Sequence, residues 1–236
     1  MKNKKWIIII PIAIIVIVCA VFIIKNIITE KNKDKALIKV KENMAEKLNN
    51  FSYNAVVNIG AYGVKLDVNL NCKEDRVNRL GYCEMQSNVV NLEEYLDYNN
   101  KATYTKTNLL TNDAFQWQKE SEKNMTEFTP ILGTLDNIII EKKEKQENGI
   151  LYTGYIKGKS LSNIFDVINK ATSNKFNISS FFRRKIPVTV FVNNDNYVEK
   201  VSFSINVLGV DVNSEINFNN FNTTPSISLP EELNGL

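Results

Sequence analysis

The sequence contains no histidine and is poor in glycine, proline and cysteine. Its 236 residues include nine glycines, five prolines and three cysteines. Without histidine the chain cannot build a Ser-His-Asp triad, a Cys-His pair or a His-ligated zinc site. The sequence also lacks a glycine-rich phosphate loop, an Asp-rich calcium loop and a nucleophile elbow. We therefore expect no enzymatic activity, no metal and no cofactor, and a function in binding or contact.

A strong excess of either charge is also missing. The net charge is +3, with 29 basic and 26 acidic residues. Nucleic-acid binding requires a strongly basic face, so no nucleic-acid partner is expected. Residues 1–25 hold four lysines and no acidic residue, so the rest of the chain is nearly neutral.

A long apolar run opens the chain. Residues 6–24 form 19 consecutive positions without a charge, and as a helix they would span roughly 30 Å, the thickness of a bilayer core. Trp6 stands where an interfacial aromatic residue is expected. The sequence predicts a cytoplasmic head at 1–5, a transmembrane anchor at 6–28 and an extracytoplasmic domain at 29–236, which places the protein in the cell membrane with a single span.

Two alternatives to a retained anchor stay open. The segment could be a cleaved signal peptide, although its apolar run exceeds the usual length. Alternatively, Cys19 could be lipidated after cleavage, although Val18 stands where a lipobox has a small residue. All three interpretations put the domain on the far side of a membrane.

The remaining sequence predicts one helix followed by many strands. Apolar residues at helical spacing (Leu37, Val40, Met44 and Leu48) predict a lead-in helix over 34–48. After Phe51 the period changes to two, and Asn148-Gly149 is a strong hairpin signal. Two further helices are expected at about 129–139 and 160–172. We predict an α+β fold with a large curved antiparallel sheet of about 9–11 strands, covered by two or three helices.

Cys72 and Cys83 fall on strands that are expected to pair. Cys72 continues the inward positions of the preceding strand, and Cys83 shares its face with Met85. A disulfide between them fits this geometry, and an extracytoplasmic location permits oxidation. Two reduced cysteines packed as small apolar residues are the alternative.

Several segments together resemble a known group of proteins. They are the helix leading into FSYNAVVNI, the stretches EEYLDYNNKATYTK and FQWQK, the closing IPVTVFVNNDNYVEKVSFSI and DVNSEINFNNFN, and a final PEE. Their order over about 35–233 resembles the LolA/LppX-like group of extracytoplasmic lipoprotein and lipid carriers. The resemblance implies a half-open β-barrel whose concave face is covered by helices and can hold an acyl chain.

On this resemblance, the chain is expected to be a membrane-anchored binding protein for a lipid or other apolar ligand. The cavity is expected to include Val64, Leu66, Val68, Leu70, Val201, Phe203, Ile205, Val210 and Val212. The alternative function is a structural or assembly role through contact with envelope proteins.

One dense basic cluster, Arg183, Arg184 and Lys185, follows two phenylalanines. It could contact anionic lipid headgroups if the domain lies on the membrane. The alternative is a loop that enters the next strand with one phenylalanine packed inward.

Overall fold

The protein folds around one large antiparallel sheet. The computed structural model describes residues 35–61, 64–88, 90–109, 116–121, 135–157, 185–207 and 210–233. The strands are β1 (Asn50–Ala61), β2 (Val64–Asp75), β3 (Leu80–Ser87), β4 (Val90–Asp97), β5 (Ala102–Leu109), β6 (Gln118–Ser121), β7 (Ile138–Gln146), β8 (Gly149–Lys157), β9 (Lys185–Asn193), β10 (Val198–Val207) and β11 (Val210–Asn219). The helical elements are α2 (Lys35–Lys47) and two 3-10 turns, η1 (Leu135–Asn137) and η3 (Glu231–Leu233).

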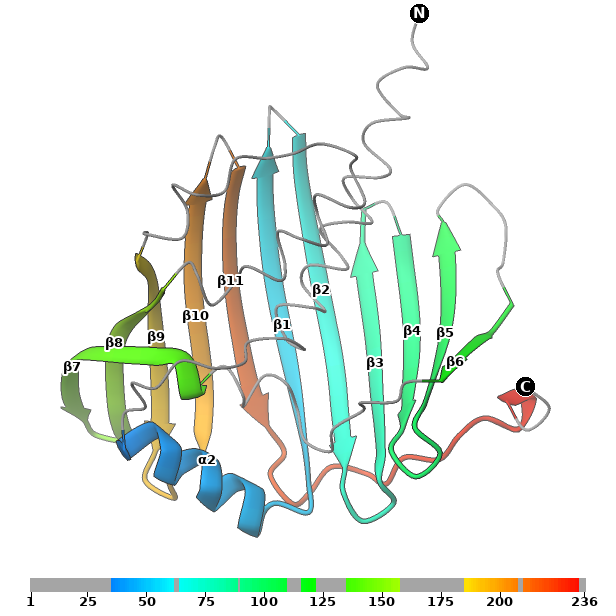
Figure 1. The fold of residues 1–236 in the computed structure, drawn as a ribbon, viewed down its shortest axis with the longest axis horizontal. Helices are drawn as coiled ribbons and strands as arrows, with labels where there is room; N and C mark the ends of the chain where they lie inside the picture. Colours follow the sequence, from blue (N-terminus) through cyan, green and yellow to red (C-terminus); the bar gives the residue numbers. More distant parts are fainter. Residues whose placement is uncertain are drawn as a thin grey trace, which may run out of the picture.

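The first and last strands meet in the middle of the sheet (Figure 1). The order is β6-β5-β4-β3-β2-β1-β11-β10-β9-β8-β7, so two meanders run outward from the β1–β11 pair. Ala55 lies opposite Leu70 on β2 and Ile216 on β11. The period-two alternation of these strands therefore aligns into one apolar and one polar face.

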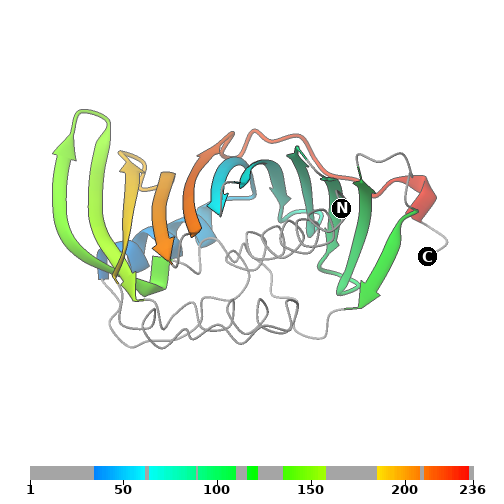
Figure 2. The ribbon, with the colours of Figure 1, turned by 90° about the horizontal axis from the view of Figure 1, so that it is seen from above.

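The sheet bends into an open arc (Figure 2). We call its concave side the inner face and its convex side the outer face. The helix α2 lies on the inner face, against the half of the sheet that carries β7–β11. Its apolar stripe is fully buried, with Leu37, Met44 and Leu48 at 0% exposure.

Hydrogen bonds from two turns hold α2 in place. Asn43 Nδ2 donates to the carbonyls of Asp195 and Asn196 in the β9–β10 turn, at 3.3 and 3.2 Å. On the other side, the Arg76 guanidinium donates to the carbonyl oxygens of Ala45 and Leu48 at the helix C-terminus, the latter at 2.8 Å. The bonds from Arg76 satisfy carbonyls that the last turn of α2 leaves without partners.

The C-terminal segment crosses the strand ends and reaches the outer face of β5. The Thr224 and Ile227 amides donate to Asn50 Oδ1 (2.9 Å) and Asp75 Oδ2 (3.0 Å). Beyond them, Leu233 packs with Ala102 and Tyr104.

The strand count agrees with the prediction, but the number of helices does not. Among the described residues α2 is the one α-helix, and it corresponds to the helix expected over 34–48. The helix expected over 129–139 is wrong in its described part, because η1 (Leu135–Asn137) is a short 3-10 turn. β7 follows from Ile138 and pairs with β8, in the hairpin that Asn148-Gly149 predicts. The segment 160–172 and the predicted anchor 6–28 lie outside the described residues. Within those residues, no helix combines the length and apolar character needed to cross a bilayer.

Candidate functional site

The inner face carries a continuous apolar surface. It crosses the adjacent strands β2, β1, β11, β10 and β9. The expected cavity positions Leu66, Val68, Leu70 and Val201 lie on it and are at least nine-tenths buried. Val64 and Val210 occupy strand ends, each opposite Ala61. The prediction omitted the contributions of β1 and β9, which are Ala55, Val57, Ile59, Val188, Val190 and Val192.

Burial along this surface is graded. Val68 and Val190 are at 0 and 1% exposure, whereas Phe203, Ile205 and Val212 on β10 and β11 are only half-buried. In Figure 1, β10 runs from α2 towards the opposite end of the sheet, so the half-buried positions lie away from the helix. This end of the inner face is where apolar surface is still partly open.

On β3–β5 the inner face mixes apolar residues such as Met85 and Leu92 with polar ones. Cys83, Glu94 and Thr105 are aligned across these strands, next to Cys72 on β2. Cys72 and Cys83 form a disulfide with a Cα–Cα distance of 4.2 Å. The hydroxyl of Tyr53 lies 3.7 Å from Cys83 Sγ.

A buried carboxylic acid lies beside this disulfide. Tyr98 Oη donates to Glu74 at 3.0 Å from Oε2 and 3.2 Å from Oε1. Gly81 gives the phenol room, because a Cβ at this position would lie 3.2 Å from Tyr98 Oη. Burial raises the pKa of Glu74 to about 8, against the hydrogen bond from Tyr98 and with a smaller contribution from the charge of Glu94. Glu74 is therefore mostly uncharged at neutral pH.

The same environment acts on the neighbouring phenols. Burial, followed by the nearby Glu74 carboxyl, raises the pKa of both Tyr53 and Tyr98. Both side chains thus remain neutral hydrogen-bonding groups. Within the part of the chain that the structure describes, no group of three or more His, Cys, Asp and Glu side chains could hold a metal ion.

The predicted membrane-contact cluster is placed only at Lys185, because Arg183 and Arg184 lie outside the described residues. Lys185 is the first residue of β9 and forms an exposed ion pair with Glu141 at 2.8 Å. Its ammonium group also lies 4.1 Å from the ring centroid of Tyr155.

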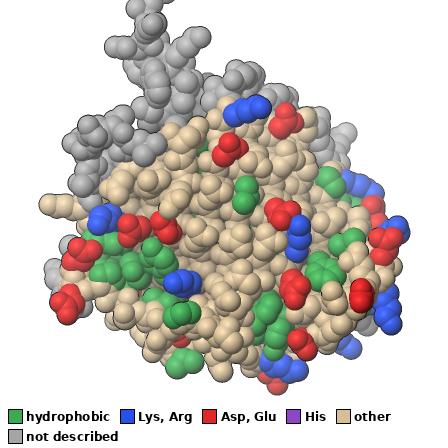
Figure 3. All heavy atoms as spheres, turned by 180° about the vertical axis from the view of Figure 1, so that it is seen from behind, with side chains coloured by type: hydrophobic (Ala, Val, Ile, Leu, Met, Phe, Trp, Pro, Cys, Tyr) green, Lys and Arg blue, Asp and Glu red, His purple; other side chains and the backbone are tan. Residues whose placement is uncertain are grey.

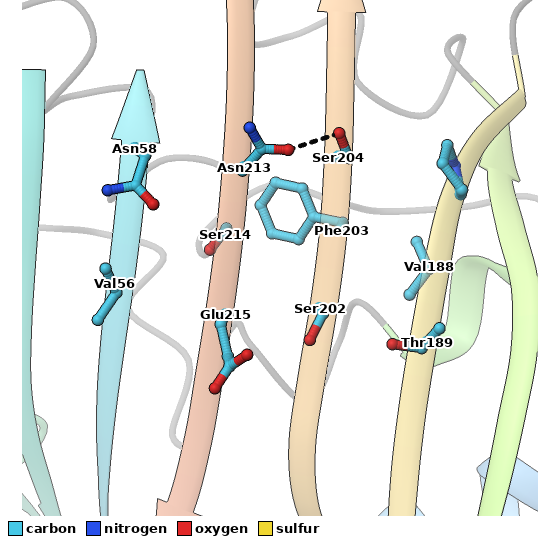
Figure 4. Close-up of a pocket in the computed structure, with 11 residues that line it drawn as sticks. Val56, Asn58, Val188, Thr189, Ser202, Phe203, Ser204, Asn213, Ser214 and Glu215 are labelled. Atoms are coloured by element: carbon cyan, nitrogen blue, oxygen red, sulfur yellow. Dashed lines mark hydrogen bonds between the residues drawn. The ribbon is translucent and has the colours of Figure 1, made fainter. Parts of the chain in front are cut away.

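A shallow groove of about 590 Å³ lies on the outer face (Figure 4). It crosses β1, β11, β10 and β9, and small hydroxyl side chains leave room in it for a ligand. Eight of its lining residues belong to the outer face: Val56, Asn58, Pro187, Thr189, Ser202, Ser204, Asn213 and Glu215. Val188, Phe203 and Ser214, which the register places on the inner face, also border it.

Hydrogen bonds fix the groove's polar groups. Ser204 Oγ donates to Asn213 Oδ1 at 2.7 Å. Lys200 forms an ion pair with Glu215 at 2.7 Å, and this contact, together with the Asn217 amide, lowers the pKa of Glu215. The groove therefore presents hydroxyl and amide groups around the Glu215 carboxylate, whose charge is balanced by Lys200.

Sequence reasoning missed Glu74 and the groove. Glu74 continues the inward positions Leu70 and Cys72 of β2. This alternation is the signal from which the inward position of Glu74 could have been predicted. No comparable signal existed for the groove, because its residues are brought together by pairing between strands that are distant in sequence.

No family model and no curated protein sequence matches this chain. Among solved structures, it is similar to the lipoprotein LppX of Mycobacterium tuberculosis, with 11% identity over 82% of this chain and 97% of LppX and a TM-score of 0.39. It is also similar to a LolA superfamily protein of Nitrosomonas europaea (8% identity, 86% of this chain, 97% of that one, TM-score 0.29). A DUF1329 family protein of Desulfovibrio piger is similar as well (8% identity, 81% of this chain, 92% of that one, TM-score 0.31). These structures include members of the group that the sequence resembles.

Proposed function

We propose that this chain is a membrane-anchored extracytoplasmic binding protein that holds a lipid or other apolar ligand against the inner face of its sheet. The observation that carries the proposal is the graded burial of that face. Its apolar surface is continuous, and it is still partly open at Phe203, Ile205 and Val212.

The dimensions of the sheet support this function. Eleven strands at a spacing of about 4.8 Å make a sheet roughly 48 Å wide. The thirteen residues of α2 extend only roughly 20 Å. A single helix of this size covers less than half of that width, so the rest of the apolar face needs further apolar cover from the chain or from a ligand.

The disulfide supports an extracytoplasmic location. A bond such as Cys72–Cys83 persists in oxidising compartments and is rare in the cytosol. Together with the apolar segment at 6–24, it favours a domain exported across a membrane and held at its surface.

A photoreactive fatty acid tests the proposal on the full chain in its own membrane. Cells that express the protein are fed the probe and irradiated, and mass spectrometry maps the labelled peptides. We expect labels on inner-face positions of β10 and β11. Labelling confined to residues 6–28 would contradict the proposal, because any membrane anchor contacts lipid.

Two neighbouring substitutions on β10 provide a matched pair. Ile205→Gln places an amide on the inner face, whereas Ser204→Gln places it on the outer face. An unpaired amide in an apolar site costs about 1–3 kcal/mol, so Ile205→Gln should reduce labelling of β10 and β11 roughly tenfold. Ser204→Gln should leave it unchanged, and equal labelling of both variants would show that the inner face does not hold the probe.

A further inference from the structure

A row of aromatic side chains stands on the outer face, away from the inner surface discussed above. Tyr82, Tyr95 and Tyr104 lie directly opposite one another on β3, β4 and β5. The ring centroids of Tyr82 and Tyr95 are 4.8 Å apart, and that of Trp117 is 5.6 Å from Tyr95. We call Tyr82, Tyr95 and Trp117 the outer aromatic platform, since these three rings are only half-buried. In Figure 3 the largest group of hydrophobic side chains on this face lies at its left side, and smaller groups are scattered over the rest.

The C-terminal segment holds the platform in position. Trp117 Nε1 donates to Glu232 Oε1 at 2.7 Å, which orients the indole ring. Leu229 and Leu233 pack with Tyr104, next to Tyr95. The rings are thus ordered before any ligand arrives, which lowers the entropic cost of binding.

Two carboxylates lie beside the rings at a cost to the sheet. Glu84 and Glu93 are directly opposite each other, one row along from the Tyr82–Tyr95 pair on the same face. Like charges in such a pair destabilise a sheet. Burial, followed by the charges of Glu93 and Glu84, raises the pKa of Tyr82 to about 12. This pairing is unfavourable for the sheet unless neighbouring groups balance its charge.

Cations balance these charges. Lys73 lies opposite Tyr82, Lys106 opposite Glu93 and Lys119 opposite Tyr104. The three acids Glu84, Glu93 and Glu232 and the three lysines leave the platform without net charge. The rim thus offers both hydrogen-bond donors and acceptors but attracts neither anions nor cations over a distance.

We propose that the outer aromatic platform binds a neutral glycan. A sugar ring stacks its apolar C–H face on an aromatic ring, while its hydroxyl groups bond to carboxylates, ammonium groups and amides at the edge. The platform offers all of these contacts. An apolar protein partner would instead have to desolvate Glu84, Glu93 and the lysines that balance them, which is unfavourable.

A row of polar side chains on the outer face connects the platform with the groove of Figure 4. Glu84 is followed across the sheet by Asn71, Asn54 and Asn217, and the Asn217 amide donates to Glu215 in the groove at 3.2 Å. From β4 to β11 this polar row spans four strand spacings, roughly 19 Å. Its length fits an oligosaccharide chain rather than a single sugar.

Binding of the full chain, in detergent micelles, to an array of neutral oligosaccharides and to chitin and cellulose particles tests the proposal. We expect retention on at least one neutral glycan, with little change between about 0.05 and 0.5 M salt, because screening affects charged ligands most. Absence of binding to every neutral glycan would overturn the proposal. Retention that disappears in high salt would also overturn it.

Variants separate binding from folding. Tyr95→Ala should weaken retention roughly tenfold or more, whereas Tyr155→Ala, an outer-face tyrosine on β8 outside the platform, should retain the wild-type affinity. Glu84→Gln should raise stability by relieving the repulsion from Glu93, yet weaken glycan binding. A purely structural role for these residues predicts no loss of binding in Glu84→Gln. Equal binding by all three variants would refute the proposal, as would capture of a protein partner that competes for the platform.

Discussion

Glu74→Gln is expected to flatten the pH dependence of stability between about pH 4.5 and 8. The pKa of Glu74 is about 8 in the folded protein and near 4.5 in the unfolded chain. Across this window the folded state holds a proton that the unfolded state has released. The free energy of unfolding therefore falls as the pH rises, and it levels off above about pH 8.

The size of this effect follows from the shift itself. At about 1.4 kcal/mol per pKa unit, the shift from 4.5 to about 8 sets an upper limit of about 5 kcal/mol. Asp75, the next residue along β2, acts in the opposite direction. Although burial pushes its pKa up, hydrogen bonds that include those from Asn78 and Ile227 outweigh burial and lower it. The contribution of Asp75 is therefore lost as the pH falls through its lowered pKa, below the window in which Glu74 acts.

Urea unfolding followed by circular dichroism at pH 5, 6, 7 and 8 measures the effect on the full chain. The wild-type protein should lose several kcal/mol between the ends of this series, whereas Glu74→Gln, which cannot ionise, should lose far less. Glu46→Gln, at an exposed position on α2, is the matched control and should keep the wild-type slope. An unchanged slope in Glu74→Gln would refute the assignment of a buried neutral carboxylic acid.

Three further changes test the disulfide, the packing of α2 and the space around Tyr98, each by urea unfolding. Replacing both disulfide cysteines by alanine should lower the free energy of unfolding by roughly 2–3 kcal/mol, and reductant should then have no further effect. Met44→Ala removes a side chain at 0% exposure and should cost about 2–5 kcal/mol, whereas a change within about 0.5 kcal/mol is expected for the exposed Glu46→Ala. Gly81→Ala brings a methyl group to 3.2 Å from the Tyr98 hydroxyl and should lower the free energy of unfolding by about 1–3 kcal/mol. An unchanged free energy of unfolding would show that Tyr98 does not need the space beside Gly81.

Much of the inner face follows from local pattern. The alternation at Leu66, Val68 and Leu70 requires these side chains to share one face of a strand, whatever the strand pairs with. The same parity places Cys72 among them, and the helical spacing of Leu37 and Met44 likewise predicts the buried stripe of α2. Such patterns involve residues a few positions apart, so the sequence contains them in full.

Local pattern failed where pairing outweighed propensity. Ile139 suits both an amphipathic helix that starts at Thr129 and the first strand of the Asn148-Gly149 hairpin. It lies in β7 because β8 offers it a ladder of backbone hydrogen bonds. Glu74 was missed because a charged residue favours a loop. In the structure, Tyr98 reaches across Gly81 and donates a hydrogen bond to the Glu74 carboxyl group inside the sheet.

The sequence by itself determined which side chains of each strand share a face, where the lead-in helix lies and which two cysteines can meet. Only the tertiary structure decided that β1 pairs with β11, more than 140 residues away in the chain. That pairing joins the two meanders into one arc and assembles the groove on the outer face. The direct alignment of Tyr82 with Tyr95 and of Glu84 with Glu93 also depends on register. Register is a relation between strands, and a one-residue slip would turn every one of these side chains to the opposite face.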